Sequence, residues 1–126
     1  MKKLVITTEK APKAIGPYSQ AIETNGMLFI SGQIPINPET GKVVDGGIEA
    51  QTEQVMKNIG AILAAAGCSY ENVVKSTCLL ADMKYFADMN KVYARYYPSE
   101  APARSTFAVK ELPLQVLVEI ETIAVK

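Results

Sequence analysis

The scarcity of arginine limits where this chain can bind a small anion through a planar fork of N–H donors. Of the 13 basic residues only Arg95 and Arg104 are arginines, and only a guanidinium offers such a fork to a carboxylate or phosphate. Arg95 falls near the end of a predicted helix, where a solvated cation that suits the helix dipole is expected. Arg104 lies at the entry to the strand predicted over 105–109, shortly after Pro102. It is the candidate anion-binding residue, with a surface ion pair as the alternative.

Two carboxylates, Glu119 and Glu121, are two residues apart in the last predicted strand, so their side chains leave the same face about 7 Å apart. That face also carries Leu117, Ile123 and Val125. A carboxylate on a face that becomes covered is partly desolvated, which raises its pKa and can make it a usable acid or base. A wet sheet edge with lysine partners is the alternative.

A glycine and an aromatic residue mark two further candidate positions. Ser31 and Gly32 end a predicted strand, where a glycine lets a ligand approach the backbone closely and exposes an N–H donor. A plain transition from strand to loop is the alternative. Tyr18 follows a Gly-Pro turn and is expected either to close a pocket or to pack as a buried aromatic.

The composition excludes several kinds of catalytic and binding site. The chain has no histidine, which rules out Ser-His-Asp and Cys-His nucleophile systems, a histidine general base and histidine-based zinc sites. Cys68 and Cys78 are too few for a four-thiolate site and lack CxxC spacing, so we expect no metal and two buried, reduced thiols. With 13 basic and 13 acidic residues, the chain lacks the basic excess of proteins that bind nucleic acid or anionic membranes.

No targeting or membrane-spanning segment is expected. The N-terminal apolar run covers only residues 4–6, whereas a secretory signal needs about 7–15 apolar residues. The longest apolar stretch, 61–68, falls far short of the roughly 20 residues of a membrane helix. We therefore expect a cytoplasmic protein.

Turn residues are spread evenly along the chain, which favours a single domain over residues 1–126. Asn25-Gly26 is the signature of a two-residue β-hairpin turn. Hydrophobic spacing predicts amphipathic helices over 48–66 and 83–97, and Gly60 in the first helix is expected to mark close approach to a sheet. The segment 32–47 is expected to be functional or to carry a minor element. The predicted strands are 3–7, 18–24, 27–31, 73–80, 105–109 and 116–125.

These elements predict an α+β fold, a two-layer sandwich of one mixed β-sheet with both helices on one face. Alternation in the last strand places on one side Val116, Val118, Ile120, Thr122 and Ala124. In the strand predicted over 73–80, the same alternation places Val74 on one side with Ser76, Cys78 and Leu80. Two helices cover only one side of a sheet whose sides are both partly apolar, so the other would stay exposed. We therefore expect a homo-oligomer built on that face.

Four short segments together carry a family resemblance. They are AIGPYSQ at 14–20, SGQIP at 31–35, PARS at 102–105 and VEIE at 118–121. In this order and spacing they resemble the signature blocks of the Rid/YjgF family, above all its RidA branch of 2-iminobutanoate/2-iminopropanoate deaminases. The match spans essentially the whole chain.

The resemblance implies a chorismate-mutase-like α+β fold and a homotrimer whose ligand pockets lie between subunits. It implies hydrolysis of reactive 2-imino and enamine acids, released by enzymes such as threonine dehydratase, to 2-keto acids and ammonia. It implies no cofactor and no partner beyond these small substrates and the other subunits.

The resemblance also assigns roles to individual residues. Arg104 would bind the substrate carboxylate, and Glu119 would position or activate the attacking water. Gly32 and Thr106 would offer backbone groups to the ligand. The pocket would also be lined by Tyr18, Ser31 and Asn90. Family members often carry cysteine where this chain has Thr106, so a side-chain role there would shift substrate preference, whereas a backbone role would not.

Two other functions remain open at this point. A non-catalytic module that binds small carboxylates would need Arg104 but not Glu119. An endoribonuclease or translation inhibitor, an activity found among relatives, would bind RNA, which the zero net charge disfavours.

Overall fold

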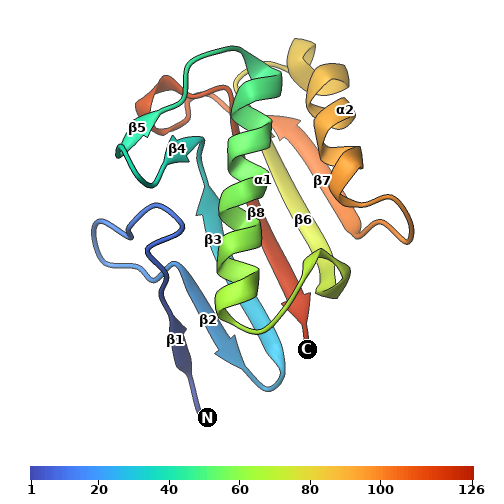
Figure 1. Ribbon diagram of the computed structural model, residues 1–126. Helices are drawn as coiled ribbons and strands as arrows, with labels where there is room; N and C mark the ends of the chain where they lie inside the picture. The colour runs from blue at the N-terminus through green and yellow to red at the C-terminus, as the bar shows by residue number, and fades with distance from the viewer.

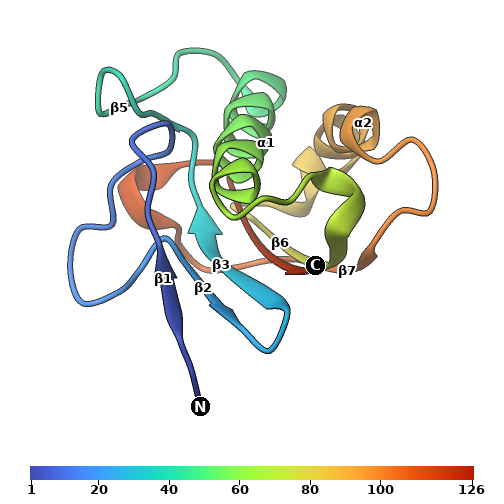
Figure 2. The same cartoon turned by 60° about the horizontal axis from the view of Figure 1, so that its bottom comes forward.

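The computed structural model describes residues 1–126, with six strands in one mixed sheet ordered β1-β2-β3-β8-β6-β7. Helices α1 and α2 both lie on one side of this sheet (Figures 1 and 2). The helices are α1 (Ile48–Ala65) and α2 (Phe86–Tyr96). The strands are β1 (Leu4–Ile6), β2 (Ala21–Thr24), β3 (Met27–Gln33), β4 (Ile36–Asn37), β5 (Lys42–Val43), β6 (Val73–Leu80), β7 (Ala103–Ala108) and β8 (Val118–Val125). The predicted two-layer α+β fold is therefore confirmed.

The β2–β3 hairpin turns at the predicted dipeptide. Thr24 pairs with Met27, and Asn25 and Gly26 have φ angles of 50° and 75°, as the twist of a type I′ turn requires. Strand β2 begins at Ala21, three residues later than predicted. Tyr18 and Ser19 have no regular secondary structure, and Tyr18 N–H donates to Gly16 O at 2.9 Å. The segment 32–47 carries the minor element, a two-stranded ribbon of β4 and β5.

The two helices bury apolar stripes against the sheet and each other. The largest fully buried side chains of the core are Leu28, Val55, Met56, Ile59, Ile62, Leu63, Leu80, Met89, Val92, Val116, Val118 and Ile120. Gly67 ends the turn after α1 with a φ of 78°, and Cys68 N–H donates to Leu63 O at 2.8 Å, the expected glycine termination. Asp82 accepts a bond from Lys84 N–H at 2.8 Å in the 3₁₀ turn that precedes α2. No helix has the length and apolar character needed to cross a membrane.

Strand β8 alternates as predicted. Its buried residues are Val118, Ile120, Thr122 and Ala124, which face the helices. The intervening side chains belong to the other side of the sheet. In β6 the prediction for Val74 was wrong, because Val73 pairs with Ala124 and Lys75 with Ile123. This bulge inserts Val74 as an unpaired residue, and its side chain is 45% exposed.

The side of the sheet opposite the helices, here called the open face, has no cover within the chain (Figure 2). Paired residues lie on the same face of a sheet, so the register sets Val5, Ile22, Phe29 and Ile123 in one row across four strands. Leu79 and Phe107 form a second apolar pair. Phe29 is 40% and Phe107 49% exposed. The predicted uncovered face is present.

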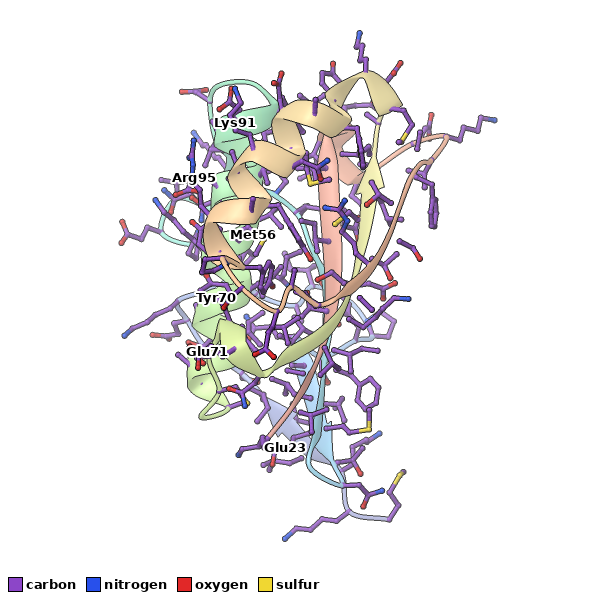
Figure 3. The ribbon with its side chains drawn as sticks, turned by 90° about the vertical axis from the view of Figure 1, so that its right-hand side faces the viewer. Glu23, Met56, Tyr70, Glu71, Lys91 and Arg95 are labelled. Carbon is purple, nitrogen blue, oxygen red and sulfur yellow. The ribbon has the colours of Figure 1, made fainter.

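Gly60 makes room for a tyrosine and not for a sheet strand, so that part of the prediction was wrong. A Cβ atom at Gly60 would overlap the Tyr70 hydroxyl and Cζ. Tyr70 reaches back from the 3₁₀ turn after α1, and its hydroxyl donates to Met56 O at 2.6 Å (Figure 3). The glycine therefore permits a tertiary contact that closes the end of α1 against the chain that follows it.

Replacing Gly60 with alanine tests this explanation. Helix propensity alone would stabilise Gly60→Ala by about 1 kcal/mol. We expect instead a loss of about 1–3 kcal/mol in the free energy of unfolding, because the methyl group displaces Tyr70 from its hydrogen bond. The control Ala64→Gly, at an exposed position of the same helix, measures how much an alanine-to-glycine difference in helix propensity changes the free energy of unfolding. Urea unfolding measures both, and a more stable Gly60→Ala protein would contradict the explanation.

Candidate functional site

The sheet separates the predicted site residues into two groups on its opposite faces. Arg104 pairs with Ser76, which is fully buried beneath the helices, so Arg104 lies on the helix-covered face. Glu119 pairs with Leu79 and stands between two buried residues of β8, so it lies on the open face. Within one chain these two groups cannot act on the same small molecule.

The first group surrounds Arg104 on the edge strand β7. Arg104 Nη1 donates to Asn90 Oδ1 at 2.7 Å, and no carboxylate lies within the 4.0 Å of an ion pair. The half-buried Arg104 lines a cavity of about 400 Å³ between α2 and the segment before β7. The cavity is lined by Asn90, Tyr93, Ala94, Tyr97, Ala101, Pro102 and Arg104. The surface ion pair considered for Arg104 is not formed.

The other arginine behaves as expected. Arg95 is exposed on the outer side of α2 (Figure 3), in the last turn of the helix. A cation there suits the helix dipole, so Arg95 needs no ligand to account for it.

The second group gathers on the open face around the end of β3. One cavity of about 490 Å³ is lined by Tyr18, Ser31, Gly32, Ile34, Pro113, Glu119 and Glu121. Tyr18 is 53% exposed, so it lines this cavity and is not a buried core aromatic. Ser31 Oγ donates to Ser19 O at 2.6 Å, which ties the 14–20 segment to β3. Four of the predicted residues therefore meet here.

Gly32 has a structural purpose that the sequence did not reveal. A Cβ atom at this position would overlap the Glu119 carboxylate, at Oε2 and Cδ. Gly32 lies in the irregular stretch of β3 where its register with β8 shifts, between Ile30 and Gln33. The glycine therefore holds space for the carboxylate in the cavity.

Burial, and secondarily the negative charge of Glu121, raises the pKa of the Glu119 carboxyl above its ordinary value. Lys3 and Glu121 both line a neighbouring cavity, together with Tyr18. A carboxyl group of raised pKa accepts a proton more readily than an ordinary one. Glu119 is thus better suited than an ordinary carboxylate to take up and return a proton.

Thr106 and Cys78 belong to the Arg104 side of the sheet. They pair with each other, and Thr106 Oγ1 is buried without a hydrogen-bond partner. Burial raises the pKa of the Cys78 thiol to about 11, so this cysteine is an inert core residue, as predicted. Because β7 is an edge strand, half of its backbone groups have no partner in the sheet.

Another cavity, of about 590 Å³, is lined by none of the predicted site residues. Its walls include Tyr70, Glu71, Tyr96 and Glu100 but no lysine or arginine. A carboxylate would find no cation there, so this cavity is not the candidate site.

Two aromatic residues of the Arg104 group were not recognised as site residues from the sequence. The guanidinium carbon lies 5.5 Å from the ring centre of Phe86 and 5.0 Å from that of Tyr93. From the sequence, both residues fall only within the amphipathic helix predicted over 83–97. Residues 86, 90 and 93 are spaced so that they share one face of a helix. Because Asn90 was already a candidate, this spacing could have indicated that Phe86 and Tyr93 lie beside it at the site.

The raised pKa of Glu119 predicts how stability depends on pH. The folded chain binds this proton more tightly than the unfolded chain does, so its contribution is present at low pH and is lost as pH rises through the raised pKa. Glu119→Gln cannot ionise. We expect it to match wild type below about pH 4 and to exceed it at pH 7–8.

Urea midpoints measured from pH 4 to pH 8 test this prediction. Glu39→Gln, which removes an exposed acid between β4 and β5, controls for the loss of one negative charge. A Glu119→Gln protein that is less stable than wild type at pH 8 would show that Glu119 is not desolvated.

Known proteins resemble this chain over its full length. The family model described as Endoribonuclease L-PSP matches residues 8–126. Reactive Intermediate Deaminase A, chloroplastic, of Arabidopsis thaliana is 54% identical over 124 residues, which are 98% of this chain and 66% of that protein. The 2-iminobutanoate/2-iminopropanoate deaminase of Mus musculus is 49% identical over 122 residues, 97% of this chain and 90% of that protein. The crystal structure of E. coli TdcF with bound serine has a TM-score of 0.93 at 39% identity and covers 98% of both chains. The chain therefore belongs to the Rid/YjgF family.

Proposed function

We propose that this protein is a deaminase that hydrolyses small 2-imino acids and their enamine tautomers to 2-keto acids and ammonia. The observation that carries the proposal is the Arg104 guanidinium, which lines a cavity with no acidic partner. A half-buried cation without a counter-ion is a ready site for an anionic ligand. The names of the mouse and Arabidopsis relatives support this substrate class.

The proposed reaction needs orientation and proton transfer. Arg104 binds the substrate carboxylate through two N–H donors and fixes the adjacent C=N carbon. Glu119 accepts a proton from a water molecule as the water oxygen attacks that carbon, and returns this proton to the imine nitrogen, which gives a carbinolamine. As the C–N bond of the carbinolamine breaks, its hydroxyl proton passes to the departing nitrogen by way of Glu119. Ammonia leaves and the oxygen becomes the keto group, so one water is consumed per substrate and Glu119 is regenerated.

The proposal requires two copies of the chain at each site, because the sheet separates Arg104 from Glu119. We propose that the open face is covered by further copies in a homotrimer. The cavity with Tyr18, Ser31 and Glu119 would then meet the Arg104 and Asn90 of a neighbouring subunit. The apolar row that includes Phe29 and Ile123 supplies the kind of surface that a stable interface buries. Thr106 would contribute backbone groups of its edge strand.

A non-catalytic module for small carboxylates is the second candidate, because Arg104 serves a binder as well as an enzyme. Glu119 distinguishes the binding module from the enzyme, since a binding module needs no proton acceptor. RNA cleavage is less well supported. The net charge is zero, whereas RNA binding draws on clustered cations.

The first test follows the decay of 2-iminobutanoate generated by threonine dehydratase. Wild type should accelerate its hydrolysis. Arg104→Ala should lower kcat/KM by about 10²-fold, with a large rise in KM. Glu119→Gln should lower kcat by about 10²–10⁴-fold while still binding 2-oxobutanoate. Glu39→Gln is the matched control. If the folded wild type binds 2-oxobutanoate without accelerating hydrolysis, the protein is a binder.

The shared site predicts that two inactive variants restore activity together. Arg104→Ala and Glu119→Gln subunits, refolded at equal concentration, should form mixed trimers in which about one quarter of the sites combine an intact Arg104 with a neighbour's intact Glu119. Activity should rise to about that fraction of wild type. Mixed trimers seen by native mass spectrometry without recovered activity, or a monomer by light scattering, would contradict the two-subunit site.

A further inference from the structure

Three residues of α2 converge on a single guanidinium. Phe86, Asn90 and Tyr93 are four and three residues apart, so they form one stripe along the helix. Two of them present aromatic rings to the Arg104 guanidinium carbon, at 5.5 and 5.0 Å, and Asn90 accepts its one side-chain hydrogen bond. Tyr93 is buried, and Phe86 and Asn90 are half-buried.

This arrangement compensates the charge of Arg104 without occupying its donors. An acidic partner would take up the N–H fork and compete with any ligand. An aromatic face attracts a cation through its π electrons and uses no N–H group. Apart from the bond from Nη1 to Asn90, the remaining N–H donors are therefore free at the cavity wall.

We propose that Phe86 and Tyr93 act as an aromatic clamp that holds Arg104 in position for a planar carboxylate, with Asn90 fixing one end of the guanidinium. This inference rests on the proposed role of Arg104 as the carboxylate anchor. Both rings are positioning residues, because they act on the substrate only through the arginine. Loss of a ring frees the long Arg104 side chain, so each binding event must then order it again.

The test compares Phe86→Leu, which removes the ring, with Phe86→Tyr, which keeps it. Phe86→Leu should weaken 2-oxobutanoate binding by about 5- to 30-fold and raise KM by the same factor, with kcat within about 2-fold of wild type. Phe86→Tyr should behave as wild type. Tyr93→Phe, which keeps its ring, serves as a second matched control. A general packing defect would lower the melting temperature and reduce kcat as well, so the split between KM and kcat separates the two roles.

A measurement without any ligand separates the clamp from the proposed function. The two rings should shift the Arg104 Nε–Hε resonance of ¹⁵N-labelled protein upfield, away from that of a free arginine. Phe86→Leu should move the resonance toward the free position, and Phe86→Tyr should not. If Phe86→Leu does not fold, Phe86→Met, which fills the space without a ring, takes its place.

Each outcome decides a different statement. A shifted Arg104 resonance in a wild type that neither binds nor hydrolyses would support the clamp and reject the deaminase. An unshifted resonance, or 2-oxobutanoate affinity that is unchanged in the ring-free variant, would overturn the clamp even if wild type is an active deaminase.

Discussion

A β-sheet directs successive side chains to opposite sides, and in this protein only one side is covered by helices. Every strand therefore serves two environments at once. In β8, Val118 and Ile120 are core positions. The acids Glu119 and Glu121 alternate with them along the strand and lie on the other side. The same alternation in β7 sends Arg104 toward α2 and Phe107 to the open face. The covered side makes the core, and the open side leaves apolar side chains such as Phe29 and Phe107 exposed.

The division of charge follows from this one-sided arrangement. The folded chain keeps a cation and a carboxylate in half-buried positions without letting them neutralise each other, because a sheet lies between them. Each is compensated locally. Arg104 has two aromatic faces and an amide, and Glu119 retains its charge less readily because its pKa is raised. Partly burying these two charged groups lowers the stability of the fold, and a core cluster of 21 buried residues offsets that loss. In the proposed function, a substrate that carries a carboxylate next to a C=N bond would match the two groups in an assembly of separate copies.

Local patterns predicted the elements well where one rule acted alone. The Asn25-Gly26 turn, the stripes of both helices and the alternation of β8 follow from the twist of a tight turn and the periods of helix and strand. Predictions were wrong where a distant segment intervened. Gly60 faces Tyr70 and not a strand, and Val74 stands at a shift in the register between β6 and β8. Neither neighbour is close in sequence, so no local pattern contains it.

The candidate site shows the same limit on what can be predicted from local sequence. Arg104, Glu119, Gly32 and Tyr18 could be chosen from residue type and motif, because the chemistry of a guanidinium, a carboxylate, a glycine and an exposed aromatic belongs to the residues themselves. The sequence by itself determined which groups are available, that histidine chemistry is absent and that one side of the sheet would lack a cover. Only the tertiary structure decided that Arg104 and Glu119 lie on opposite faces, that Gly32 makes room for a carboxylate and that the rings of Phe86 and Tyr93 lie close to the guanidinium. These are facts of strand register and helix placement, and register is set by long-range pairing that a linear pattern does not record.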